Sequence, residues 1–151
     1  MRYHILLDLF LVIALLVSGC GGNASTAISP TSTTESQAVE DQASLIAALQ
    51  ASGATVEVGE PITQAFFTPE GNIIKVNGAD VQVFEYESSE AMENEASQVA
   101  PDGGSIGTSM VDWIDTPHFY KAGRIIVLYV GSDEAILDIL QKVLGPQFSG
   151  R

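Results

Sequence analysis

An Asn-Gly pair, Asn77 and Gly78, lies between two segments of alternating apolar residues, 73–76 (Ile-Ile-Lys-Val) and 79–86 (Ala-Asp-Val-Gln-Val-Phe-Glu-Tyr). Asn and Gly both tolerate the positive φ that a two-residue turn requires, so this pattern predicts a β-hairpin. The turn also sets the register. The expected cross-strand pairs are Val76 with Ala79, Lys75 with Asp80, and Ile74 with Val81. The chain therefore requires antiparallel pairing in this region.

A second hairpin is predicted further along the chain, where residues 118–121 and 124–130 flank a turn at Ala122 and Gly123. Its second arm contains residues 125–130 (Ile-Ile-Val-Leu-Tyr-Val), which are apolar on both faces. That pattern is typical of a strand in the middle of a sheet. Weaker strand patterns occur at residues 55–58, at 66–67 and at 106–114.

Three segments have the periodicity and end signals of helices. The first contains Leu45, Ile46 and Leu49 at helical spacing and precedes a glycine. The second begins after a serine pair, and the third follows another serine and ends before a Gly-Pro pair. The expected boundary residues are Asp41 or Ser44 and Gly53 for the first, Ser88 or Ser89 and Pro101 for the second, and Ser132 and Gly145 for the third.

Each hairpin is followed by one of these helices, and the two units are offset by 44 to 45 residues. A duplicated strand-turn-strand-helix unit would build a mostly antiparallel sheet with the helices packed on one face. The alternative is that two unrelated hairpin-helix units share the same turn and cap chemistry. In either case the sequence predicts an α+β fold, with residues 43–151 as a single globular domain.

Helices on one face would leave the other face of the sheet open to solvent or to a partner. Aromatic side chains with polar tips are enriched where proteins bind one another. We therefore predict a contact surface for an envelope protein or a small apolar ligand, either on the open sheet face or in a groove beside Trp113. Its candidate residues are Phe84, Tyr86, Trp113, Phe119 and Tyr120.

Residues suited to catalysis are few. His118 is the only histidine beyond the first 19 residues, and Cys20 is the only cysteine. No glycine-rich phosphate loop and no metal-binding spacing of His or Cys occurs. Asp112, Asp115 and His118 lie within seven residues and could form a metal or acid-base cluster. We favour a solvated turn with one ordinary histidine hydrogen bond, because their spacing matches no known ligand pattern. We therefore predict no catalytic residue, no metal and no cofactor.

The chain is strongly acidic, with 19 Asp and Glu against 6 Lys and Arg and a net charge of −13. Nucleic acid and anionic lipid both repel such a charge. The composition therefore excludes a nucleic-acid partner. It also means that any membrane association has to come from a covalent anchor.

The first nineteen residues have the three parts of a secretory signal. Arg2 precedes an apolar stretch over residues 9–17, and two small residues, Ser18 and Gly19, precede Cys20. A membrane-spanning helix needs about 20 apolar residues, and Asp8 interrupts this run. We therefore predict that residues 1–19 are a signal peptide that is removed.

Residues 17–20 (Val-Ser-Gly-Cys) resemble the lipobox of bacterial lipoproteins. The resemblance implies cleavage by type II signal peptidase between Gly19 and Cys20, and a diacylglyceryl group on the Cys20 thiol. Residues 20–42 are rich in Ser, Thr and Gly, so we interpret them as a lipidated N-terminus and a flexible tether. The resemblance further implies an exported protein, anchored to the cell membrane or outer membrane, whose mature domain belongs to an uncharacterised lipoprotein group.

The function that the sequence favours is that of a membrane-anchored, extracytoplasmic lipoprotein acting as a protein-interaction or accessory module of the cell envelope. The alternative is a small-ligand-binding lipoprotein. An enzyme ranks third, because no catalytic constellation is found.

Overall fold

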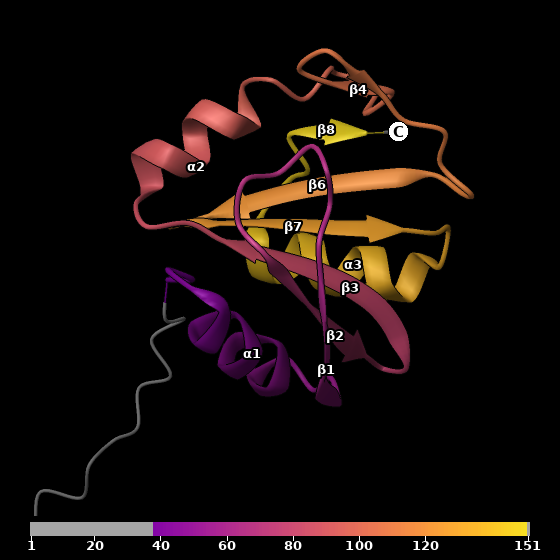
Figure 1. The fold of residues 1–151 in the computed structure, drawn as a ribbon. Helices are drawn as coiled ribbons and strands as arrows, with labels where there is room; N and C mark the ends of the chain where they lie inside the picture. Colours follow the sequence, from indigo (N-terminus) through magenta and orange to yellow (C-terminus); the bar gives the residue numbers. More distant parts are fainter. Residues whose placement is uncertain (1–37, 151) are drawn as a thin grey trace, which may run out of the picture. The chain divides into compact units, whose positions relative to one another are not determined.

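The computed structural model describes residues 38–150, which form an α+β domain (Figure 1). Its helices are α1 (Gln42–Ala51), α2 (Ser89–Ala96) and α3 (Glu134–Leu144). Its strands are β1 (Val56–Ile62), β2 (Gly71–Val76), β3 (Ala79–Glu85), β4 (Ser105–Ile106), β5 (Ser109–Met110), β6 (Pro117–Ala122), β7 (Ile125–Val130) and β8 (Ser149–Gly150). Six strands form one antiparallel sheet in the order β1-β2-β3-β7-β6-β8, while β4 pairs only with β5. The predicted α+β class is confirmed.

The first predicted hairpin is formed by β2 and β3, in the register that the Asn-Gly turn implies. Asn77 and Gly78 have φ angles of 50° and 89°, the left-handed conformation for which this pair is suited. The observed cross-strand pairs include Val76 with Ala79, Lys75 with Asp80, and Ile74 with Val81. The Lys75 ammonium also forms an ion pair with the Asp80 carboxylate.

The second hairpin is formed by β6 and β7, and its turn lies one residue later than predicted. Ala122 still pairs with Ile125, so the turn residues are Gly123 and Arg124 rather than Ala122 and Gly123. Gly123 supplies the left-handed conformation, with a φ of 50°. Strand β7 lies between β3 and β6 and is buried from Ile125 to Tyr129, as its two-sided apolar pattern predicted.

One face of the sheet, here called the α1/α3 face, is covered by α1 and α3. Leu45 and Leu49 of α1 and Leu140 of α3 are fully buried against apolar side chains of the sheet. Asp41 and Ser44, both predicted as start residues of α1, form a reciprocal capping box. The Ser44 backbone N–H and hydroxyl both bond to the Asp41 carboxylate and lower the pKa of Asp41.

The opposite face, here called the α2 face, is covered by α2 and by loops (Figure 1). The prediction that the helices pack on one face is therefore right for α1 and α3 and wrong for α2. Met92 and Ala96 of α2 are buried with Phe84, Ile126 and Leu128, large residues of the sheet that need cover on this side. If the two hairpin-helix units were duplicates related by a twofold axis between β3 and β7, α2 and α3 would lie on the same face of the sheet. They lie on opposite faces, so the similarity between the two units is limited to their hairpins.

The β1–β2 connection, residues 63–70, crosses the α2 face. The predicted strand at Phe66 and Phe67 is wrong, because these residues form a turn whose rings pack into the core. The ring centroids of Phe67 and Phe84 are 4.7 Å apart, and those of Phe66 and Trp113 are 5.8 Å apart. The segment 106–114 is not a continuous strand either, since Gly107, with a φ of 57°, turns β4 back onto β5.

A carboxylate of α2 holds this loop in place. Glu95 accepts a hydrogen bond from the Tyr86 hydroxyl at 2.6 Å and others from the Thr68 backbone and hydroxyl. Burial, reinforced by the neighbouring Glu95 carboxylate, raises the pKa of Tyr86. The Tyr86 hydroxyl therefore stays protonated, and the bond that joins β3, α2 and the β1–β2 loop is kept.

The chain enters the domain beside the β6–β7 turn. The Arg124 backbone N–H donates to the Glu40 carbonyl at 2.9 Å, and the Arg124 guanidinium forms an ion pair with Glu85 at 2.6 Å. Val39 is already buried, so the domain begins before residue 43, where the predicted tether ends. The predicted cleavage and lipidation residues, Gly19 and Cys20, lie outside the described residues. Among residues 38–150, no helix has the length and apolar character needed to cross a membrane.

Candidate binding cleft beside Trp113

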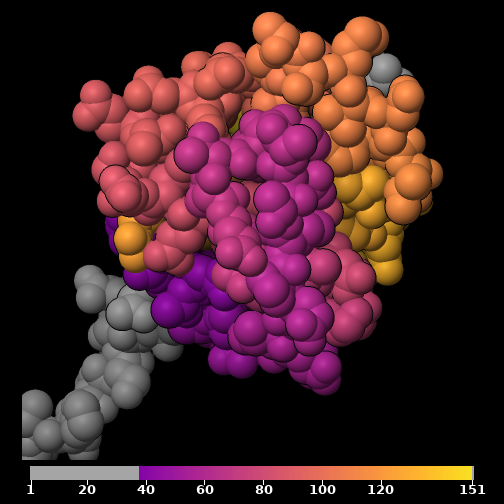
Figure 2. All heavy atoms as spheres, in the orientation of Figure 1, coloured from indigo at the N-terminus to yellow at the C-terminus, as the bar shows by residue number. Residues whose placement is uncertain are grey.

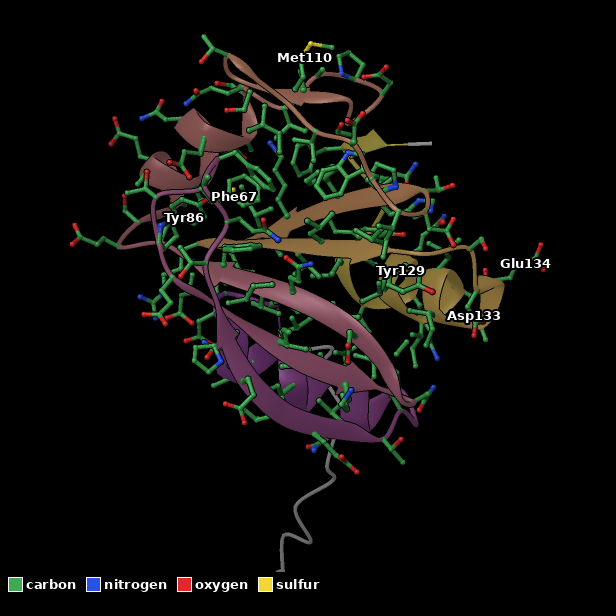
Figure 3. The ribbon with its side chains drawn as sticks, turned by 45° about the vertical axis from the view of Figure 1, so that its right-hand side comes forward. Phe67, Tyr86, Met110, Tyr129, Asp133 and Glu134 are labelled. Carbon is green, nitrogen blue, oxygen red and sulfur yellow. The ribbon has the colours of Figure 1, made fainter. Side chains whose placement is uncertain are left out.

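The exposed aromatic surface predicted from the sequence is wrong for four of its five residues. Phe84 and Phe119 are fully buried in the core of the α2 face, and Tyr86 is buried beside them. Tyr120 is buried in the core of the α1/α3 face, where burial raises the pKa of its hydroxyl. The part of the sheet that holds Phe84, Tyr86 and Phe119 is not open, because α2 and the loops cover it (Figure 3).

Trp113 is the exception, since it is half-buried at the margin of the same core. Its indole N–H donates to the Gly103 carbonyl at 2.7 Å. Its ring meets Phe66 and Phe119 nearly at right angles, with centroid distances of 5.8 and 5.9 Å. These contacts fix the ring orientation, which leaves Trp113 as a preorganised aromatic surface.

A cleft of about 350 Å³ opens beside Trp113, at the small end of the range of about 300 to 1,000 Å³ common for ligand sites. It lies in the segment before β6, part of which appears in orange at the upper right of Figure 2. Its lining includes three aspartates, Asp102, Asp112 and Asp115, together with Val111, Trp113 and Pro117. Among residues 38–150, the lining contains no Lys or Arg.

The aspartates give the cleft a negative potential. Asp102 accepts a hydrogen bond from the Gly104 backbone at 2.9 Å, and Asp115 accepts one from the Thr116 backbone at 2.7 Å. Asp112 and Asp115 are both exposed at the surface. Within residues 38–150, the ion pairs of Lys75, Lys121 and Arg124 involve other carboxylates.

Exposed apolar side chains adjoin the cleft in the sequence. Across residues 38–150 the large apolar side chains that stand exposed are Val58, Met110 and Ile114, at 65%, 91% and 100%. Met110 and Ile114 each neighbour a residue of the cleft lining, and Met110 projects outward from the β4–β5 ribbon (Figure 3). The sequence analysis did not identify either residue, because both lie in residues 106–114, which were predicted to form a strand.

His118 takes no part in this cleft. It is buried on β6, where its Nε2 donates to the Gly131 carbonyl at 3.1 Å and its Nδ1 lies 2.7 Å from the Gln147 side-chain oxygen. Asp112 and Asp115 line the cleft instead, so the structure does not bring together the cluster considered from the sequence. The described part of the chain contains no group of three metal-binding side chains.

The cleft lies at the opposite end of β6 from the point where the chain enters the domain. Pro117, the first residue of β6, lines the cleft, whereas the turn after β6 holds Glu40 through Arg124. A six-residue antiparallel strand spans about 20 Å. Residues 38–40 therefore join the domain at the end of β6 that is remote from Pro117.

Comparison of the chain with models of protein families, with curated proteins and with solved structures gives no match. The assignment of a role to the cleft therefore depends on its geometry and chemistry.

Proposed function

We propose that this protein is a lipid-anchored lipoprotein of the cell envelope whose extracytoplasmic domain binds a partner protein through the cleft beside Trp113. The observation that carries the proposal is the exposure of two large apolar side chains next to residues of the cleft. Met110 and Ile114, two of the three large ones in residues 38–150, neighbour lining residues in the sequence. Aromatic side chains such as Trp113, which lines the cleft, are enriched in protein interfaces.

The anchor follows from the lipobox-like residues 17–20 and from the charge of the chain. A net charge of −13 gives no affinity for anionic lipid, whereas acyl chains contribute about 0.8 kcal/mol for each buried methylene. Residues 38–40 enter the domain at the β6–β7 turn, whereas Pro117 of the cleft lining is at the other end of β6, so the attachment point of such an anchor would be remote from Pro117.

Small-ligand binding is the second candidate, and it is favoured by one observation. The cleft volume of about 350 Å³ is large enough for a small molecule. Asp112 and Asp115, both exposed in its lining, favour a cationic ligand over the apolar ligand expected from the sequence.

Replacing the lipidation residue tests the anchor. We expect the full-length protein to incorporate labelled palmitate and to sediment with membranes, and the Cys20→Ser variant to incorporate none. Ser25→Ala, a change within the predicted tether, is the matched control and should behave as wild type. Palmitate incorporation that persists in Cys20→Ser would contradict the anchor.

A further inference from the structure

We propose that Asn77 is a site of spontaneous deamidation, in which the backbone nitrogen of Gly78 displaces the side-chain nitrogen of Asn77 as ammonia. The only co-reactant is water. Neither residue lines the cleft beside Trp113, so this inference does not depend on the proposed function. The reaction would place a carboxyl group in the turn between β2 and β3.

The attacking nitrogen is accessible. Asn77 and Gly78 are both exposed, and together they form the two-residue turn. Within residues 38–150, no hydrogen bond engages the Gly78 N–H. A Cβ built on Gly78 meets nothing within 4 Å, so the space beside this nitrogen is open. Because glycine has no side chain of its own, nothing on Gly78 shields the nitrogen either.

The attack is intramolecular and therefore gains from proximity. The Gly78 nitrogen loses its proton to solvent and forms a bond to the Asn77 Cγ, which closes a cyclic imide with the backbone. The Cγ–Nδ2 bond breaks, and the departing nitrogen takes up a proton and leaves as ammonia. Water then adds to one carbonyl of the imide and opens the ring. No group is oxidised or reduced in either step.

Thr55 polarises the amide that is attacked. Its backbone N–H donates to the Asn77 Oδ1 at 2.9 Å, and its hydroxyl donates to the same oxygen at 3.2 Å. This oxygen becomes negatively charged when the Gly78 nitrogen adds to Cγ. Donors already directed at an oxygen on which charge develops lower the barrier to such a reaction. The turn therefore presents an activated amide next to an unhindered nucleophile.

The imide opens in two ways that affect the turn differently. Addition of water at Cγ gives aspartate, whose carboxylate can still accept both bonds from Thr55. Addition at the Asn77 backbone carbonyl gives isoaspartate, in which the main chain runs through Cγ and is longer by one carbon. The oxygen that Thr55 holds then belongs to the main chain of a turn that no longer fits the pairing of Val76 with Ala79. Isoaspartate should therefore loosen the turn from Thr55, which directly precedes the edge strand β1.

Two other asparagines of the described chain serve as internal controls. Asn72 precedes Ile73, whose branched side chain hinders the backbone nitrogen, and its own side chain donates to Gln42. Asn94 is exposed like Asn77, but it precedes Glu95 within α2, where the backbone N–H groups form helical hydrogen bonds. Neither asparagine lies next to a glycine, so we expect Asn77 to react before both.

Incubation of the full-length protein in heavy-oxygen water at neutral pH, followed by proteolysis and mass spectrometry, measures deamidation at each asparagine. We expect Asn77 to incorporate the label at least tenfold faster than Asn72 and Asn94, with isoaspartate among its products. Gly78→Ala should slow the reaction at Asn77 at least tenfold and leave Asn72 and Asn94 unchanged. This variant has space for its added Cβ, so the turn is retained. Hydrogen exchange at the Thr55 amide should be faster in the isoaspartyl fraction.

Two outcomes would overturn the proposal. A rate at Asn77 no higher than the rate at Asn94 would mean that the turn does not activate its asparagine. An unchanged rate at Asn77 in Gly78→Ala, with aspartate as the sole product, would mean that water attacks the side chain directly and that the Gly78 nitrogen takes no part.

Discussion

The Phe84→Ala variant is expected to lose about 3 to 5 kcal/mol in its free energy of unfolding, the usual cost of removing a fully buried phenylalanine. Phe84 has no exposed surface, and its ring lies 4.7 Å from the Phe67 ring. A Cβ at Gly71, on the neighbouring strand, would approach the Phe84 ring to 2.7 Å, so the packing there is tight. Urea unfolding followed by circular dichroism measures the difference.

The control for this prediction is Val58→Ala. Val58 is 65% exposed on the edge strand β1, so its truncation should change the free energy of unfolding by less than about 0.5 kcal/mol. A loss at Phe84 as small as the loss at Val58 would mean that the α2 face is open, as the sequence had suggested, and that the covering helix and loops are loosely held.

Gly123→Ala is expected to cost about 2 to 4 kcal/mol, because it combines backbone strain with a collision. Gly123 has a φ of 50°, and a Cβ there would lie 2.3 Å from the Glu40 Cα. The chain segment around Glu40 would have to move, which breaks the hydrogen bond from the Arg124 backbone N–H to the Glu40 carbonyl. Urea unfolding and hydrogen exchange at the Arg124 amide measure the two effects.

Gly78→Ala separates the two contributions. Gly78 also has a positive φ, 89°, but a Cβ there meets nothing within 4 Å. The Gly78→Ala variant should therefore lose only the free energy of the backbone strain, about 1 kcal/mol. Hydrogen exchange at the Arg124 amide should be unchanged. Equal losses for the two variants would show that the segment containing Glu40 is not held against the β6–β7 turn.

Local patterns determined the parts of the fold that were predicted well. The Asn77-Gly78 turn allows one register, and residues 125–130, apolar on both sides, have to lie inside a sheet. The starts of α1 and α2 followed the expected capping chemistry at Asp41 and Ser88, whereas α2 ends at Ala96, before the expected Pro101. The cap of α3 is Asp133 and not the expected Ser132. In each case the deciding interactions lie within a few residues of one another.

The parts predicted wrongly depend on contacts between distant segments. The face that α2 covers is decided by Tyr86, Glu95 and Thr68, which come together only in the folded chain. The sequence pattern shows that Phe84 and Tyr86 lie on the second face of the hairpin, but it does not show that the β1–β2 loop crosses above them. The aromatic residues were therefore assigned to a surface when they form a core.

The cleft was foreseen in part. Trp113 was expected to border a groove, and it does; Asp112 and Asp115 were considered only as part of a cluster with His118. Met110 and Ile114 were not considered, because the short apolar pattern of residues 106–114 does not show which of its side chains are exposed.

Photocrosslinking tests whether the domain binds a partner protein through the cleft beside Trp113. Benzoylphenylalanine would replace either Ile114, beside the cleft, or Val58, an exposed control position on β1, in the full-length protein in its native cells. We expect position 114 to capture a defined protein and Asp112→Asn/Asp115→Asn to abolish the capture. Position 58 should capture nothing. The same protein captured equally from position 58, or no capture from position 114, would contradict the account.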